Sequence, residues 1–349
     1  MKNRFILYTF ILLTLHVAAQ PPQGYYSSAL NKSGATLKTS LYGIISSGYV
    51  DKGYDFLYEI YKTSDNTAGG KVWDMYSTCT WSHGVKKCGS YQIVCDCYNR
   101  EHSIPQSWFN SSSPMVSDAF HVYPTDGKVN GQRSNYPFGE CSGGTTLTNG
   151  KGRSGSSTYP GYSGTVFEPD NEFKGDFART YFYFATRYEN IMTSIEGDSF
   201  NGTKFPAFTT WSKEMFMKWH RQDPVSQKEI TRNNAIYVYQ KNRNPFIDHP
   251  ELAEYLWGNL AGTPWSLTTV NTPAELLVKF YFNINEKEIT MTTQSSPVKY
   301  RILNISGQIV NTGTVDQQRK ISLAALSSGM YLVQFEWNEI KAVKKIVIK

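Results

Sequence analysis

A carboxylate and an imidazole stand side by side at Glu101-His102, in a short segment that ends at Pro105. A carboxylate can hold a hard divalent cation, and a neutral imidazole can take a proton from water. Asn130 adds an amide oxygen that suits the same kind of cation. If the segment around Asn130 is helical, Arg133, three residues later, lies on the same face of the helix as Asn130. A cation, a base and a positive group are the parts that phosphodiester hydrolysis requires.

Each of these residues also has a plainer interpretation. Glu101 and His102 could form an exposed polar pair at a strand end, and Asn130 could be a turn or cap residue. Arg133 could belong to a structural ion pair. A dipeptide identifies a site only within a longer motif.

Other polar residues compete for a functional role. His121, in a run whose alternation predicts a half-buried strand, is the alternative general base. We expect His220 and His249 at the surface or at helix ends, rather than as ligands. The stretch 242–246 has the residue types of a site, but we interpret it as an Asn/Pro turn with Phe246 in the core.

The N-terminal residues indicate the compartment. A positive start at 1–4 is followed by an apolar run at 5–17 and by small residues before Gln20. This pattern predicts a secretory signal peptide over 1–20, too short to span a membrane. No later stretch predicts a membrane span. We therefore expect export through the periplasm, to the medium or the cell surface. We also expect a monomer.

Composition sets broad limits. The 349 residues, 40% of them hydrophobic, allow one large globular domain and a small one. The net charge of +6 suits a polyanionic partner, although an ordinary basic surface would give the same value. The sequence lacks the HExxH and GxSxG motifs and a Walker-type loop, so it does not predict those hydrolase or nucleotide-binding classes.

Five cysteines, an odd number, follow the signal segment: Cys79, Cys88, Cys95, Cys97 and Cys141. An oxidising compartment favours disulfides. Because the number is odd, at least one thiol stays free or pairs with another molecule. The spacing fits neither structural zinc nor a CxxC redox pair. We favour Cys88–Cys97, which would close a loop just before Glu101, and Cys79–Cys95 is also possible.

Two kinds of hydrophobic pattern divide the chain. Helical spacing predicts two helices within 35–62, broken near Gly48, and further helices at 173–188, 211–220, 223–239 (with Pro224 in its first turn) and 252–257. The Gly/Ser/Thr-rich stretch 141–164 predicts a long loop, mobile or folded over a site. A polar linker is expected at 259–273. Short alternating runs then predict a small β-sandwich at 274–349, with strands at 276–282, 298–304, 320–323, 331–337 and 342–348.

Four motifs, at 99–108, 126–135, 171–179 and 222–258, resemble in this order the endonuclease I family of secreted bacterial nucleases. The resemblance implies a ββα-metal (His-Me finger) core, one Mg²⁺ or another divalent cation such as Mn²⁺, and cleavage of DNA, and often RNA, without sequence preference. By motif, His102 corresponds to the general base, and Glu101 and Asn130 correspond to the metal ligands. Arg133 and Arg179 correspond to residues that contact phosphate, although Arg179 could instead pair with Asp176.

The resemblance also implies a mechanism. Unprotonated His102 takes a proton from the attacking water, the cation stabilises the charged phosphate and the departing 3′ oxygen, and the products carry 5′-phosphates. An ordinary imidazole pKa predicts loss of activity below about pH 6. The alternative function is a catalytically inactive extracellular nucleic-acid-binding protein on the same scaffold.

Three segments of the tail, 300–308, 326–333 and 344–349, resemble the C-terminal sorting domain of type IX secretion substrates. The resemblance implies an address that outer-membrane secretion machinery reads and that is normally cleaved. The alternative is an accessory β-sandwich that binds carbohydrate or nucleic acid. The overall prediction is an α+β protein: a mostly helical nuclease domain at 21–258 around a ββα core, followed by a small all-β sandwich.

Overall fold

The computed structural model describes residues 21–266, 279–283, 287–292, 298–304, 307–315, 320–337 and 340–348. They belong to two compact units, one within Met1–Ser266 and one within Leu267–Lys349. The predicted signal peptide and residues 267–273 of the predicted linker lie outside the described residues. In the part of the chain that is described, no helix is both long enough and apolar enough to cross a membrane.

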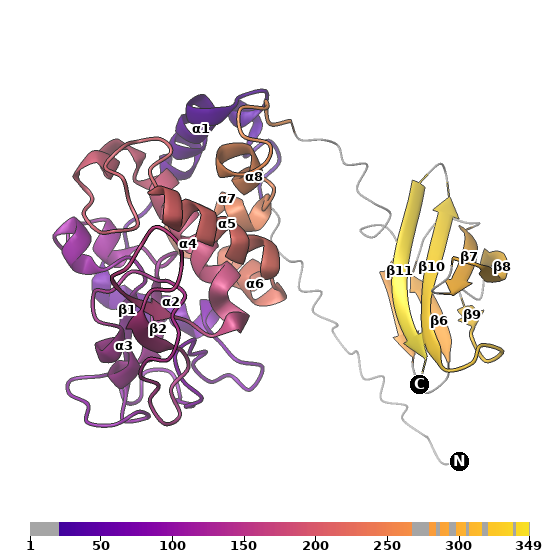
Figure 1. The fold of residues 1–349 in the computed structure, drawn as a ribbon, viewed down its shortest axis with the longest axis horizontal. Coiled ribbons are helices and arrows are strands. Elements are labelled where there is room, and N and C mark those ends of the chain that lie inside the picture. Colours follow the sequence, from indigo (N-terminus) through magenta and orange to yellow (C-terminus); the bar gives the residue numbers. More distant parts are fainter. Residues whose placement is uncertain are drawn as a thin grey trace, which may run out of the picture. The chain divides into compact units, whose positions relative to one another are not determined.

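The first unit is mainly helical, as predicted for an α+β protein (Figure 1). Its α-helices are α1 Gly34–Ser46, α2 Leu57–Ser64, α3 Gly127–Arg133, α4 Lys174–Arg187, α5 Thr210–Gln222, α6 Gln227–Gln240, α7 Pro245–Asp248 and α8 Leu252–Trp257. Its strands are β1 Tyr98–His102, β2 Val122–Asp126, β3 Arg153–Ser156 and β4 Thr165–Glu168. Short 3-10 helices are η1 Ser27–Ala29, η2 Tyr54–Phe56, η3 Gln106–Phe109, η4 Met115–Ser117, η5 Asn171–Phe173 and η6 Glu189–Ser194.

Helix α4 forms the centre of this unit, and all of its residues are buried. Its aromatic side chains, among them Phe177, Tyr181 and Phe184, belong to the large apolar core. Helix α6 begins at Gln227 rather than at Pro224 as predicted. Ser226 and Glu229 form a reciprocal capping box there: the side chain of each residue accepts a hydrogen bond from the backbone N–H of the other.

Strands β1 and β2 form an antiparallel hairpin that leads directly into α3. The hairpin and α3 lie at one end of the first unit, and α1 and α8 lie toward the other (Figure 1). The half-buried strand predicted around His121 was wrong, because β2 begins at Val122 and all five of its residues are buried. Strand β2 is therefore internal, whereas Asn99 and Arg100 of β1 are partly exposed.

The predicted loop 141–164 is folded against the unit. It contains β3, which pairs with β4, and Thr145 and Ser154 bridge within it. Its backbone also bonds to the segment before the hairpin: Lys151 N donates to Tyr76 O over 2.7 Å, and Thr78 N donates to Asn149 O over 3.0 Å. The loop thus packs beside Tyr76, a residue of the candidate site.

The first unit extends beyond residue 258, where its boundary was predicted. Trp265 is fully buried, and its backbone N donates to Lys32 O over 2.7 Å. Asn31 N donates to Trp265 O over 2.6 Å. The two ends of the unit are therefore joined.

The second unit is a small β-sandwich, as predicted. One sheet has the order β11-β10-β7-β8 and the other β5-β6-β9. The bounds are β5 Lys279–Asn283, β6 Glu288–Thr292, β7 Val298–Asn304, β8 Ile309–Val315, β9 Lys320–Ser322, β10 Gly329–Trp337 and β11 Ile340–Ile348. Residues of both sheets, such as Ile289 and Val333, share one apolar core. Strands β6 and β8 were not among the predicted strands.

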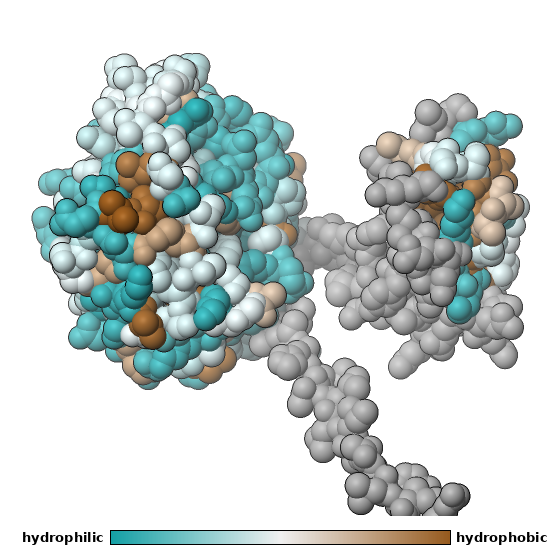
Figure 2. Space-filling model, turned by 90° about the horizontal axis from the view of Figure 1, so that it is seen from below, coloured by the Kyte–Doolittle hydropathy of each residue, from teal (hydrophilic) through white to brown (hydrophobic). Residues whose placement is uncertain are grey.

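The surface of the first unit is mainly hydrophilic in the view of Figure 2, with small separate hydrophobic patches. Large apolar side chains that are exposed include Val85 and Ile93, at 56% and 67%. Isolated exposed residues of this kind are normal on a globular protein.

Candidate functional site

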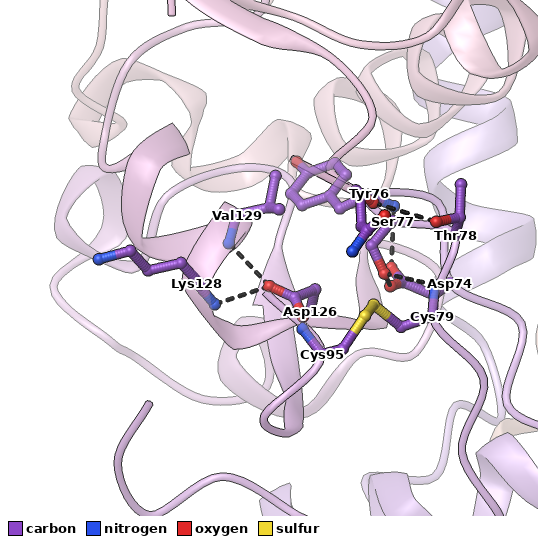
Figure 3. The surroundings of a disulfide bond; sticks show 10 residues. Asp74, Tyr76, Ser77, Thr78, Cys79, Cys95, Asp126, Lys128 and Val129 are labelled. Atoms are coloured by element: carbon purple, nitrogen blue, oxygen red, sulfur yellow. Dashed lines mark hydrogen bonds between the residues drawn. A yellow bond between two sulfur atoms is a disulfide. The ribbon is translucent and has the colours of Figure 1, made fainter. Parts of the chain in front are cut away.

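Helix α3 begins at a specific cap at the end of the hairpin. The carboxylate of Asp126 accepts hydrogen bonds from the backbone N–H groups of Lys128 and Val129, over 2.8 and 2.9 Å (Figure 3). It also accepts one from Cys95 N over 2.7 Å. An N-cap of this type stabilises a helix by about 1 kcal/mol. The cap therefore fixes where α3 starts relative to β2.

The segment that covers α3 carries two disulfides, Cys88–Cys97 and Cys79–Cys95. The favoured pairing and the second possible pairing are both confirmed, and Cys141 is the buried free thiol. A side chain at Gly127 would collide with Cys88 Sγ, and one at Gly131 would collide with the hydroxyl of Tyr91. Two glycines one turn apart thus allow the cross-linked segment to lie directly on α3.

The predicted metal ligands lie on the same side of β1. Asn130 Nδ2 donates to Asn99 Oδ1 over 2.8 Å. Asn99 and Glu101 share a strand face because they are two residues apart. On Glu101, Oε1 accepts a hydrogen bond from the Tyr76 hydroxyl over 2.9 Å and lies 3.4 Å from Arg133 Nη1. Helix α3 therefore covers the face of β1 that carries Glu101.

Arg133 is only 1% exposed, and it binds backbone as well as Glu101. Its Nη1 donates to His102 O over 3.1 Å, and its Nη2 donates to Ser103 O. The predicted phosphate contact therefore needs correction, because the guanidinium is already used within the fold. Arg133 ties α3 to the end of β1 and holds Glu101 in place.

The Glu101 carboxyl is 2% exposed. Burial raises its pKa to about 6, although Arg133 and the Tyr76 hydrogen bond both act to lower the pKa. Above that pH the group is a carboxylate. Its Oε1 atom accepts the hydrogen bond from Tyr76 and is also the oxygen that lies nearest to Arg133. The second oxygen is the one that a cation could use.

His102 is held in one tautomer. Its Nε2 lies 2.9 Å from Val116 O. A carbonyl oxygen only accepts, so Nε2 must carry the proton and Nδ1 must carry the lone pair. Burial lowers the His102 pKa to about 3, and nearby His121 acts in the same direction. The predicted ordinary pKa is therefore wrong, and the ring stays neutral at pH values well below 6.

Glu101 and His102 leave the end of β1 in opposite directions, because consecutive strand residues point to opposite faces. The ring of His102 lies beside Tyr54 and His121, with centroids 5.7 and 5.9 Å away. The expected base and the expected ligands thus flank the last residues of β1 instead of sharing one face. A phosphate could meet both only at the strand end.

The alternative base, His121, is less suited to proton transfer. It is fully buried, whereas His102 keeps 4% exposure. Its Nε2 donates to Met115 O over 2.7 Å, and its Nδ1 is buried with no partner among the described residues. That nitrogen is therefore not exposed to solvent in this conformation.

Arg179 is fully buried in an ion-pair network. It pairs with Glu229 and with Asp176, the latter over 3.2 Å, and its Nη1 donates to Asp223 O over 2.7 Å. The plainer interpretation, a structural ion pair, is what the structure contains. The expectation that Arg179 contacts the substrate is not compatible with this burial.

The remaining candidates are architectural. Asn244 caps α7 and Phe246 is fully buried, as the predicted turn required. His220 lies in the last turn of α5, but it is buried rather than at the surface. His249 is partly exposed next to Glu251, 3.3 Å away.

The available donors fit a hard cation that keeps much of its water. Among the described residues there is no group of three or more His, Cys, Asp or Glu side chains that could hold a metal. Glu101 and Asn130 offer one carboxylate and one amide oxygen. Magnesium is commonly bound through one or two carboxylates, with waters and substrate phosphates completing its shell. A zinc site of nitrogen and sulfur ligands does not fit.

Sequence reasoning missed three residues that build this site. Asp126 could have been found, because an aspartate directly before a helical segment is a typical N-cap. Asn99 could have been found as the neighbour of Glu101 on the same strand face. Tyr76 gave no signal, because only the fold brings it to Glu101.

The structure thus combines an α+β domain, in which a hairpin leads into a short helix, with a small β-sandwich domain. The Endonuclease I family profile matches residues 33–251, and the Secretion system C-terminal sorting domain matches 279–349. The chain therefore belongs to the Endonuclease I family, and its sorting domain marks it as a secreted nuclease.

Known relatives agree with this assignment. The chain is 35% identical over 243 residues to an extracellular ribonuclease of Bacillus amyloliquefaciens. The matched region is 67% of this chain and 78% of the relative. It is 34% identical over 256 residues to an extracellular ribonuclease of Bacillus subtilis (strain 168), covering 70% and 83%. A periplasmic deoxyribonuclease of Aeromonas hydrophila is 29% identical over 134 residues, covering 38% and 48%.

Proposed function

We propose that the chain is a metal-dependent endonuclease without sequence preference, in which His102 is the general base. One divalent cation, Mg²⁺ or another such as Mn²⁺, would be held by Glu101 and Asn130. The observation that carries the proposal is the fixed tautomer of His102, which leaves Nδ1 as an acceptor on a neutral ring. The placement of Glu101 and Asn130 on the same side of β1 supports the metal site.

The chain's own residues then have separate tasks. Nδ1 of His102 takes a proton from the attacking water. Val116 O stays bonded to Nε2 and so keeps the ring oriented as the proton arrives. Arg133 and Tyr76 hold the Glu101 carboxylate toward α3. The bound cation would supply charge stabilisation for the scissile phosphate and the departing oxygen.

Both nucleic acids are proposed substrates. The two Bacillus relatives are named as ribonucleases, and the Aeromonas relative is named as a deoxyribonuclease. We therefore propose cleavage of DNA and RNA, with 5′-phosphate ends as products.

A plasmid-nicking assay and a single-stranded RNA assay test the proposal. We expect activity with Mg²⁺ and none with excess EDTA. His102→Ala should lose roughly 10²-fold or more of turnover and still bind Mn²⁺ in calorimetry. His83→Ala is the matched control, because that imidazole is also hydrogen-bonded, to Asn66 over 2.6 Å, but lies outside the site. Undiminished cleavage by His102→Ala would contradict the assigned base.

A further inference from the structure

Two imidazoles bind to two consecutive backbone carbonyls. His121 Nε2 donates to Met115 O over 2.7 Å, and His102 Nε2 donates to Val116 O over 2.9 Å. Both carbonyls belong to the short helix η4. The position of the acceptor for His102 therefore depends on how η4 is held.

The far side of η4 is anchored through Asp118, which follows it directly. The fully buried Asp118 carboxylate accepts hydrogen bonds from the hydroxyls of Tyr183 and Tyr188, each over 2.8 Å, and from Gln240 Nε2 over 2.9 Å. The first residue of η4, Met115, is held by the ring of His121. These contacts leave η4 little freedom to move.

His121 also reaches the segment next to His102 through its backbone. Ser103 N donates to His121 O over 3.0 Å, and the two imidazole rings are 5.9 Å apart. His121 is thus bonded both to η4 and to the residue after His102. It fixes the distance between His102 and its carbonyl acceptor from both ends.

The ring of His121 satisfies one buried polar atom and leaves another unsatisfied. Its Nδ1 is buried without a partner in the described part of the chain, which is a costly arrangement for a polar atom. An apolar side chain of similar size would avoid that cost. What it would not supply is the donor to Met115 O.

We propose that His121 is a positioning residue for His102, an inference that rests on the proposed role of His102 as general base. The Nε2–H donor of His121 fixes η4 so that Val116 O holds His102 as the Nε2–H tautomer. That tautomer leaves Nδ1 as the base. His121 itself takes no proton from water or substrate.

The test compares variants of the full chain that keep or remove this donor. His121→Gln keeps an amide N–H that can reach Met115 O, whereas His121→Leu removes the donor. If the leucine variant does not fold, His121→Asn replaces it, because its shorter amide cannot reach the same carbonyl. His220→Leu is the matched control, since His220 is also buried and its Nε2 donates to Pro250 O over 3.1 Å, away from the site.

The first measurement is the tautomer of His102 by ¹⁵N NMR on metal-free protein at neutral pH, with the His102 signals identified by their loss in His102→Ala. We expect the Nε2–H tautomer in the wild type, in His121→Gln and in His220→Leu. We expect a mixture in His121→Leu or His121→Asn. The second measurement is cleavage kinetics, where loss of the donor should lower kcat roughly 10- to 100-fold and leave KM nearly unchanged.

The outcomes are distinguishable. An unchanged His102 tautomer in a folded variant without the donor overturns the inference. Failure of His121→Gln to restore the tautomer and kcat also overturns it. A shifted tautomer with unchanged kcat supports the positioning role but overturns His102 as the general base.

Discussion

Replacing Arg133 by methionine should destabilise the first unit strongly. The methionine fills much of the same volume, but the buried Glu101 carboxylate loses its positive partner at 3.4 Å. The carbonyl oxygen of His102 loses its donor as well, whereas that of Ser103 keeps the hydrogen bond from the Tyr181 hydroxyl. The perturbation is therefore the removal of one partner from a buried polar cluster.

The expected loss follows from these contacts. Breaking a buried ion pair by removing one partner costs about 3–5 kcal/mol. The carbonyl that loses its donor adds about 1 kcal/mol. We expect a decrease of about 5 kcal/mol in the free energy of unfolding at pH 8, which is large against the roughly 5–15 kcal/mol of a typical domain.

The loss should also depend on pH. Burial already raises the Glu101 pKa to about 6 from 4.5, so ionisation of this group opposes folding as pH rises through that window. Without Arg133 the pKa rises further, because the guanidinium acts to lower it. The destabilisation should therefore be smaller at pH 5, where Glu101 is mostly protonated, than at pH 8.

Denaturant unfolding monitored by tryptophan fluorescence, in EDTA, measures this effect. Seven of the eight tryptophans precede residue 267, so the signal reports mainly the first unit. Arg221→Met is the control, because Arg221 pairs with Glu254 at a partly exposed site, and the substitution should cost about 1 kcal/mol or less. A loss for Arg133→Met no larger than the control's, or one equal at pH 5 and pH 8, would refute this reasoning.

Three further predictions concern the metal, a buried acid and a disulfide. Asn130→Ala should raise the Mg²⁺ concentration for half-maximal cleavage by roughly tenfold or more, as measured by metal titration, and an unchanged requirement would exclude Asn130 as a ligand. Burial raises the Asp74 pKa from 3.8 to about 7, so ionisation of Asp74 opposes folding between these pH values. The stability of Asp74→Asn relative to the wild type should therefore increase from pH 4 to pH 7 in denaturant unfolding, and a flat difference would count against the shift. Replacing Cys79 and Cys95 by serine should lower the free energy of unfolding by about 3 kcal/mol, because their disulfide closes a loop with a sequence separation of 16. Equal midpoints for this double variant and the wild type would count against that estimate.

Much of the fold could be predicted because its patterns are local. The aromatic residues of α4 recur at helical spacing, and β7 alternates over the predicted residues. Boundaries failed where a side chain decided them, as when Ser226 capped α6 after Pro224. The prediction of a half-buried strand around His121 failed because β2 is buried on both faces, so its residues do not alternate between buried and exposed.

The candidate site was only partly readable. Motif order identified Glu101, His102 and Asn130, and the structure places Glu101 and Asn130 on the same side of β1. The burial of Arg133 and Arg179 could not be foreseen, since an arginine in a motif gives no sign of whether its partners are phosphates or carbonyls. The lowered pKa of His102 likewise depends on burial that only the tertiary structure creates.

The joined ends of the first unit limit how this protein can be trimmed. Residues 31–32 and Trp265 hold each other by two backbone hydrogen bonds, and the indole ring is completely enclosed. Removal of a leader before Pro21 and detachment of the sorting unit after Ser266 would both leave these hydrogen bonds and the buried indole ring in place. A cut at residue 258 would instead remove Trp265 from the apolar interior, so a shortened chain that keeps the first unit whole would have to end beyond Trp265.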